Sequence, residues 1–221
     1  MAGHKNRKEK KARNIGKRPL APMLGYYLIV TDTQATERAY FEGLRESLPQ
    51  EIQRLRSLVI HVEDTGTVNL VSKCKELFEY DPQYRIPWIV FDRDQVPDFD
   101  DIVADAEKEG INAGWSNPCL EIWLFAYFGR MPSINTSWQC CSSFGDLYKQ
   151  KTGQEYHKSD RKLYKKLLAY GNERNAIKIA EQKYKEQMAD HLKEKPSDMI
   201  PCTTVFRLVK EIRSKTDNAE N

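Results

Sequence analysis

The stretch PWIVFDRD at residues 87–94 decides the fold, because a short apolar run ends abruptly in two acids. Its β-branched and aromatic residues are typical of a buried strand. Asp92 and Asp94 follow at a spacing of two, which directs both carboxylates to the same side if the chain stays extended. Functional groups gather at the carboxyl ends of parallel strands, so the stretch predicts a site at that edge of a sheet.

Similar apolar runs on either side predict three further strands: residues 25–31, 57–62 and 111–115. The helical patterns between the strands cover three stretches: residues 35–48, a helix that Thr67 caps, and residues 98–109. Strands that alternate with helices imply right-handed crossovers and a largely parallel sheet. We therefore predict an α/β fold in which helices flank a mostly parallel sheet.

The remainder of the chain has a helical pattern. Asn117 is expected to cap a helix whose first residue is Pro118, and that helix is apolar almost all round, so it should be buried. Residues 142–215 then predict three or four amphipathic helices. We divide the chain into three parts: a basic disordered tail (1–20), an α/β core (21–130) and a helical C-terminal part packed on the core (131–221).

The net charge of +3 conceals a basic N-terminus. Residues 1–18 hold eight Lys and Arg residues against one Glu, which gives +7 and leaves −4 for the rest. Such an arm either contacts a phosphate backbone or is a solvated tail, and its composition fits both. No apolar run approaches the roughly 20 residues of a membrane span, and no secretory signal is evident, so we expect a cytoplasmic protein.

The cysteines and histidines show no pattern of metal ligands. The five cysteines include no Cys-x-x-Cys pair, and the four histidines add no regular spacing. Free thiols in a reducing compartment are therefore the favoured interpretation, rather than a zinc site.

The acids favour a different kind of metal site. If the strands ending at Asp32 and Asp92 are neighbours, their ends lie about 5 Å apart. Three carboxylates in that space, with Asp94 as the third, cannot all stay ionised without a cation. Mg²⁺ or Mn²⁺ is the expected occupant. The alternative is that Asp92 and Asp94 are ordinary turn residues after a strand. No glycine-rich phosphate loop or dinucleotide fingerprint is present, which argues against an ATPase or a dinucleotide enzyme.

Four blocks of sequence resemble the RloB-like proteins, which are small Toprim-type proteins found in bacterial defence loci. The blocks occur in the family's order and span nearly the whole chain after the tail: LIVTDTQATERAYFEGL (28–44), VFDRD (90–94), SNPCLEIWL (116–124) and PCTTV (201–205). The resemblance implies a Toprim-like core.

Toprim domains hold Mg²⁺ with a first-motif Glu and a later Asp-x-Asp pair. By position, the resemblance makes Asp92 and Asp94 metal ligands and places Asp32 at the first acid, with Thr33 where the family has Gly. Asp is one methylene shorter than Glu, which affects any role that depends on position. Glu37 matches the family's second acid, and its alternative role is that of a surface acid favoured by the helix dipole.

The third block suggests further site residues. Glu121 falls among apolar neighbours, where a carboxylate needs a partner or a metal. The resemblance implies a place beside the acids for Ser116, Asn117 and Glu121, although helix capping alone would explain the string. Lys162 and Arg174 are candidates for binding phosphate. The alternative is that both are ordinary solvated basic residues on a helix surface.

The resemblance implies a Mg²⁺-dependent endonuclease in bacterial anti-phage defence. Its substrate would be DNA or a structured RNA such as tRNA, and its partner an AAA- or ABC-type ATPase encoded nearby; self-association stays open. The alternative is a Toprim-like adaptor that binds nucleic acid or the ATPase without cutting. The shortened first acid favours the adaptor, and the presence of both Asp92 and Asp94 favours the nuclease.

Overall fold

A five-stranded sheet forms the centre of the computed structural model and orders its strands β2-β1-β3-β4-β5. The structure describes residues 24–32, 35–56, 58–80, 85–94 and 96–219, so the basic tail at 1–20 lies outside the described residues. The strands are β1 (Gly25–Thr31), β2 (Leu58–Asp64), β3 (Arg85–Asp92), β4 (Asn112–Asn117) and β5 (Cys202–Thr203). Strands β1 to β4 pair in parallel and β5 pairs antiparallel with β4, which confirms the mostly parallel sheet.

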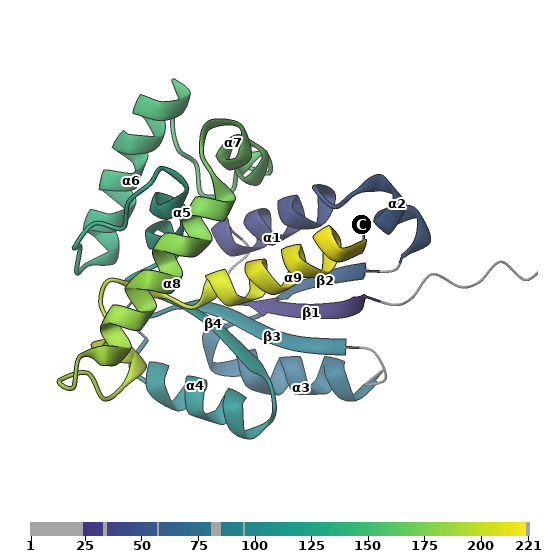
Figure 1. Cartoon of the computed structure of the whole chain (residues 1–221). Coiled ribbons are helices and arrows are strands. Elements are labelled where there is room, and N and C mark those ends of the chain that lie inside the picture. The colour runs from purple at the N-terminus through teal and green to yellow at the C-terminus, as the bar shows by residue number, and fades with distance from the viewer. Residues whose placement is uncertain (1–23, 33–34, 57, 81–84, 95, 220–221) are drawn as a thin grey trace, which may run out of the picture.

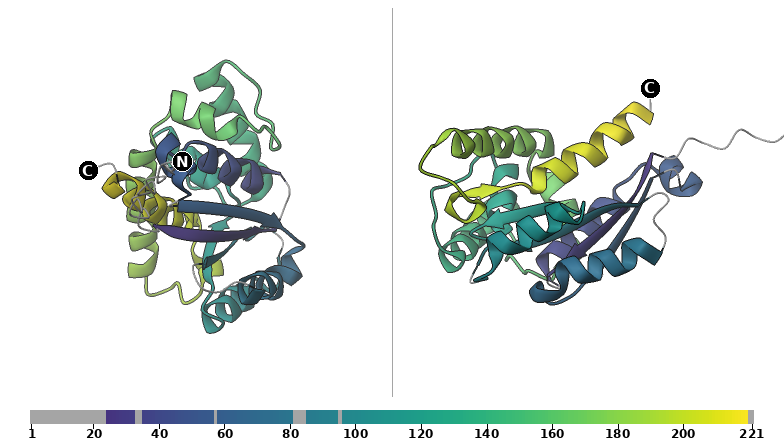
Figure 2. Two further views of the ribbon diagram at one scale, coloured as in Figure 1. Left: turned by 90° about the vertical axis from the view of Figure 1, so that its right-hand side faces the viewer. Right: turned by 90° about the horizontal axis from the view of Figure 1, so that it is seen from below.

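Helices cover both faces of this sheet (Figure 1). They are α1 (Thr36–Glu46), α2 (Gln50–Leu55), α3 (Leu70–Tyr80), α4 (Phe99–Lys108), α5 (Glu121–Tyr127), α6 (Ser137–Thr152), α7 (Leu163–Tyr170), α8 (Glu173–Ala189) and α9 (Val205–Ala219), with short 3-10 turns at Thr67–Asn69 and Pro196–Asp198. Helices α3 and α4 lie on one face of the sheet, and α1 and α9 lie on the other (Figures 1 and 2). Helices α6 and α7 lie on the same side of the sheet as α1 and α9 (Figure 1). Among the described residues, no helix has both the length and the apolar character needed to cross a membrane.

Alternation of side chains along β1 explains this layering. Tyr27 and Ile29 belong to the apolar cluster that includes α1, α5 and α9, whereas Leu28 and Val30 belong to the cluster under α3 and α4. Successive side chains of a strand point to opposite faces, so an unbroken apolar strand needs cover on both. The short run at residues 25–31 therefore requires a sheet between two layers.

The boundary predicted at Asn117 is wrong. Asn117 does not cap a helix, because β4 continues through it and pairs with Cys202 of β5. The Arg93 backbone N–H also donates to the Ser116 carbonyl at 2.8 Å, which keeps this segment in the sheet. A cis peptide bond joins Asn117 to Pro118, and α5 begins only at Glu121. The predicted burial of this helix is confirmed, since every residue of α5 is buried.

The C-terminal part also contains a strand that the sequence pattern does not predict. Thr204 extends the pairing of β5, because its hydroxyl accepts from the Trp115 backbone N–H at 2.9 Å and its own N–H donates to the Trp115 carbonyl at 2.8 Å. Strand β5 has only two residues, too few for any periodicity to register. The six-residue helix α2 is likewise absent from the prediction.

A largely buried polar network holds together four helices on the face of the sheet that α1 and α9 cover. The hydroxyls of Tyr40 and Tyr127 are 2.7 Å apart, and the Tyr127 hydroxyl donates to Glu173 Oε2 at 2.9 Å. Arg213 Nε donates to the other Glu173 oxygen at 2.7 Å. Helices α1, α5, α8 and α9 each contribute one member. The position of α5 relative to α1 is thus fixed by hydrogen bonds as well as by packing.

The contact between α1 and α7 depends on a glycine. A Cβ atom added to Gly43 would lie 2.5 Å from the Tyr164 Cβ, whereas one added to Gly145 of α6 would meet nothing within 4 Å. We expect Gly43→Ala to destabilise the protein by about 1–3 kcal/mol through overpacking. Gly145→Ala, the matched control, should stabilise it by up to about 1 kcal/mol through helix propensity. Urea denaturation of both variants measures the difference, and equal stability of Gly43→Ala and wild type would contradict the close packing.

Candidate metal centre

Two aspartates meet where neighbouring parallel strands end. Asp32 directly follows β1 and Asp92 is the last residue of β3, and these strands pair with Thr31 opposite Val90. The Asp32 backbone N–H donates to the Val90 carbonyl at 3.3 Å, and the Asp32 carboxylate accepts a hydrogen bond from the Asp92 backbone. The expectation that these two strands are neighbours is confirmed, and it places both acids at one edge of the sheet.

Two glutamates from the helical layers join them. Glu37 lies in the first turn of α1 and is 4% exposed, while Glu121 begins α5 and is 1% exposed. Burial, and after it the charges of Glu37, Asp32 and Glu121, raises the pKa of Asp92 well above its usual range. The structure therefore brings together four of the five acids predicted for the site: Asp32, Glu37, Asp92 and Glu121.

The crowding leaves carboxylate oxygens without partners. Burial, followed by the charge of Glu37, raises the pKa of Asp32 to about 7. Within the described part of the chain, Asp32 Oδ1, Asp92 Oδ1 and Glu121 Oε2 are buried and have no hydrogen-bond partner. Buried polar atoms are normally satisfied, so several unsatisfied oxygens of one sign in one place need an explanation. A hard divalent cation such as Mg²⁺ prefers oxygen ligands of this kind, and the residues fit it.

Asp94 occupies a different position from the other acids. Its backbone has a φ of 25°, so the chain is not extended there and the simple rule for an Asp-x-Asp pair does not apply. The Asp94 N–H donates to the Pro118 carbonyl at 3.0 Å, which holds this turn against the segment that follows β4. The side chain is exposed, although its charge contributes to the raised pKa of Asp32. Asp94 thus lies at the open side of the acidic centre.

The two polar residues at the end of β4 have separate environments. Ser116 is fully buried, with its hydroxyl 3.0 Å from that of Thr203 in β5. Asn117 donates from Nδ2 to the Ser197 carbonyl at 3.0 Å and lines a cleft. Ser116 therefore joins two strands, whereas Asn117 faces the cleft.

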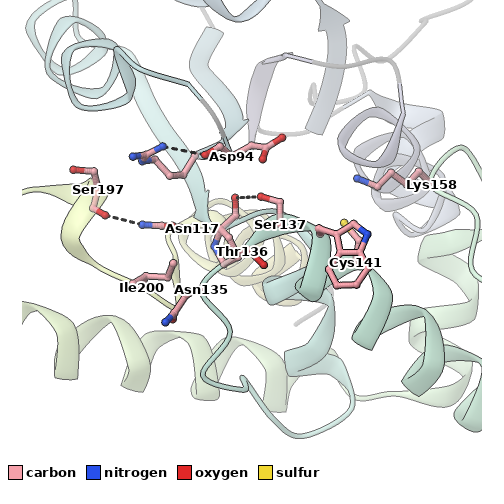
Figure 3. A pocket seen from close by; sticks show the side chains of 12 residues that line it. Asp94, Asn117, Asn135, Thr136, Ser137, Cys141, Lys158, Ser197 and Ile200 are labelled. Carbon is pink, nitrogen blue, oxygen red and sulfur yellow. Dashed lines mark hydrogen bonds between the residues drawn. The ribbon is translucent and has the colours of Figure 1, made fainter.

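That cleft opens beside the acids and has a volume of about 660 Å³. Figure 3 shows Asp94 on one side of it, with Lys158 and Cys141 together on another. Arg93, Trp138 and the N-terminal residues of α6 also line it. Trp138 is 81% exposed, so a large aromatic surface is available at this cleft.

The basic residue that pairs with Glu121 is not one of the predicted ones. Lys162 is exposed just before α7, and Arg174 of α8 pairs with Asp217 at 3.7 Å. Glu121 Oε1 instead accepts from the Tyr156 hydroxyl at 2.9 Å and lies 3.4 Å from Lys158 Nζ. Tyr156 and Lys158 come from the segment between α6 and α7, which has no motif or periodicity that would have indicated them.

A known protein family matches most of the chain. The family model for RloB-like protein matches residues 27–212, a range that contains Asp32, Glu37, Asp92, Asp94 and Glu121. The chain belongs to the RloB-like family. The resemblance stated from the sequence blocks is therefore confirmed. No curated protein and no solved structure matches this RloB-like chain.

The raised pKa of Asp32 predicts how stability depends on pH. Folding raises this pKa from 3.8 to about 7, so the contribution of Asp32 to stability is fully present below pH 4 and is lost as the pH rises through 7. The loss is on the order of 4 kcal/mol at most. We expect Asp32→Asn in EDTA to become more stable than the wild type between pH 4 and pH 8, as measured by urea denaturation.

The same titration can be followed with the metal. Because carboxylates bind a cation only when deprotonated, Mg²⁺ should raise the melting temperature of the wild type more at pH 8 than at pH 5. Asp32→Asn should show a smaller increase at pH 8. A wild type whose stability in EDTA does not fall relative to Asp32→Asn as the pH rises would show that Asp32 is not strained by its neighbours.

Proposed function

We propose that this RloB-like protein is a Mg²⁺-dependent nuclease. The observation that supports it most strongly is a pair of buried carboxylate oxygens, on Asp32 and Asp92, that have no hydrogen-bond partner among the described residues and lie within a group of crowded acids at the carboxyl edge of a parallel sheet. An open cleft adjoins this group. Unsatisfied carboxylates are costly in a merely structural role, and a bound divalent cation would give these oxygens the partner that they lack.

The acids have distinct roles in this proposal. Asp32 and Asp92 would hold a Mg²⁺ ion, with Asp94 as a further ligand. Bound Mg²⁺ polarises a phosphoryl oxygen and lowers the pKa of a water molecule. Asp32, or Glu37 next to it, would accept the proton that the attacking water loses. The reaction is hydrolysis of a phosphodiester.

The cleft suits a nucleic-acid strand. Arg93 supplies positive charge for phosphate, and Asn117 supplies a polar side chain. The exposed indole of Trp138 offers a surface on which a base can stack, an interaction that every base can make. Both DNA and a structured RNA such as tRNA present phosphates and accessible bases, so the lining supports either substrate.

The biological setting follows from the family resemblance. RloB-like proteins are found in bacterial defence loci, often next to a gene for an AAA- or ABC-type ATPase. We propose that this ATPase senses infection and restrains or releases the nuclease. Cleavage assays therefore need the ATPase in one arm and the isolated protein in the other.

Asp92→Asn is the central test of the nuclease. The variant should cut plasmid, single-stranded DNA or total tRNA at least about 100-fold more slowly with Mg²⁺ or Mn²⁺, since metal-held charge stabilisation contributes several kcal/mol. Its stability in EDTA should equal or exceed that of the wild type, because one of the crowded charges is removed. Loss of cutting without loss of folding separates a catalytic role from a structural one.

Asp146→Asn is the matched control, because Asp146 is an exposed acid on α6 and should leave cutting unchanged. Equal cutting by Asp92→Asn and the wild type would contradict the metal nuclease. If neither protein cuts, even with the ATPase present, the adaptor becomes the better proposal. In that case, a gain of cutting by Asp32→Glu would identify the shortened acid as the cause.

Trp138→Ala tests the proposed path of the strand. Stacking of one base on an aromatic side chain contributes about 1–3 kcal/mol, so the variant should bind a single-stranded oligonucleotide roughly 10- to 100-fold more weakly. Tyr80→Ala is the control, because Tyr80 is 90% exposed at the end of α3. Fluorescence anisotropy in EDTA measures binding without cleavage. Equal weakening by both variants would place the strand elsewhere.

A further inference from the structure

A second cluster of metal-binding groups lies next to the acids. Cys119 and Cys141 are 22 positions apart in the chain, yet their sulfur atoms are 3.9 Å apart because α5 packs against α6. One carboxylate oxygen of Glu121 lies within 4.8 Å of both sulfurs. All three side chains are buried or partly buried, and no disulfide joins the two cysteines.

We propose that Cys119, Glu121 and Cys141 form a zinc site that is separate in its chemistry from the Mg²⁺ site. Thiolate ligands select zinc and similar soft ions, whereas Mg²⁺ takes oxygen ligands only. The expectation of merely free thiols came from the absence of regular cysteine spacing in the sequence. Here the turn that leads into α5 and the start of α5 bring Cys119 and Glu121 against Cys141 of α6, and a spacing rule does not detect such a tertiary contact.

The separation of the sulfurs matches a tetrahedral zinc ion. Zn–S bonds of about 2.3 Å at a tetrahedral angle place two thiolate sulfurs about 3.8 Å apart. The observed 3.9 Å needs almost no adjustment. A disulfide would instead require the sulfurs to approach to about 2.05 Å. The pair is therefore closer to the geometry of a shared metal than to that of a bond.

Glu121 is held as a metal ligand usually is. Its Oε1 accepts from the Tyr156 hydroxyl at 2.9 Å and lies 3.4 Å from Lys158 Nζ, while within the described residues its Oε2 is buried without a partner. Ligating carboxylates are typically oriented by hydrogen bonds of this kind, which tune affinity for the metal. Tyr156 and Lys158 thus fix the orientation of Glu121 through one of its oxygens.

The charges balance when zinc is included. Two thiolates and one carboxylate carry −3, so a bound Zn²⁺ leaves −1, and the ammonium group of Lys158 cancels the remainder. Lys158 and Cys141 both line the cleft, and they lie together there in Figure 3. Solvent in the cleft can therefore supply the fourth ligand and give the ion a way in, as in zinc sites with three protein ligands.

Cobalt binding is the most direct test. Co²⁺ replaces zinc and gives a strong near-ultraviolet absorption only when thiolates coordinate it, so carboxylate binding at the acidic centre stays invisible. We expect reduced, full-length protein to develop this band with one Co²⁺ per chain and to lose it when Zn²⁺ is added. Asp92→Asn should retain the band, because its acid belongs to the other site.

Variants of the ligands and of their neighbours sharpen the result. Cys119→Ser and Cys141→Ser should each lose the band. Cys74→Ser, the matched control, should keep it, because Cys74 is buried in the apolar cluster under α3 and α4. A serine there can keep the hydrogen bond to the Trp88 carbonyl. Tyr156→Phe should weaken Zn²⁺ binding roughly 10- to 100-fold without abolishing it. A band that survives in both ligand variants would overturn the proposal.

X-ray absorption at the zinc edge of the wild type gives a measurement that does not depend on how variants fold. Two sulfur scatterers at about 2.3 Å, with lighter atoms beside them, would support the site. Zinc surrounded only by oxygen or nitrogen would overturn it, as would the absence of any thiolate band with Co²⁺ in fully reduced protein.

Discussion

Repulsion among buried carboxylates is the constraint on which the rest of this structure depends. The sheet order places the ends of β1 and β3 side by side, which brings Asp32 next to Asp92, and the buried start of α5 adds Glu121. The charges of Glu37 and of neighbouring acids help to raise the pKa values of Asp32 and Asp92, so the metal-free protein keeps protons or strain that a cation would remove. Such crowding is tolerated only where the surrounding fold determines the positions of these groups.

The helices that cover the sheet fix the positions of these acidic groups. Tyr40 of α1 and Tyr127 of α5 share a hydrogen bond, and Glu173 with Arg213 extends the network through α8 to α9. Removing one partner would leave a buried charge uncompensated, which makes the network resistant to local rearrangement. The C-terminal segment therefore helps to position the site, because Arg213 of α9 belongs to the hydrogen-bond network and β5 pairs with β4, the strand that leads to α5.

The sequence predicted what local patterns encode. The apolar runs predict β1 and β3. Asp32 and Asp92 follow these runs, and they are predicted to lie together because parallel strands place their carboxyl ends at one edge of the sheet. The pairing of β5 was not predictable from two residues, nor was the turn at Asp94, where a φ of 25° ends the extended chain. Tyr156 and Lys158 reach Glu121 from 35 and 37 positions away through tertiary packing alone. Family resemblance supplied Glu121, whereas spacing rules missed the Cys119–Cys141 pair.

Glu121 connects the two groups of ligands. Its charge helps to raise the pKa of Asp92, and it also lies beside both thiols. A cation on the sulfur side would compensate that charge and so lower the cost of ionising Asp92, while the repulsion between two cations would oppose a second ion. Whichever effect is larger, the coupling between the two sites must be reciprocal, because each ion changes the affinity for the other by the same factor. The soft-metal ligand Cys119 is thus connected to the acidic centre over three consecutive buried residues, Cys119, Leu120 and Glu121, which lead into α5.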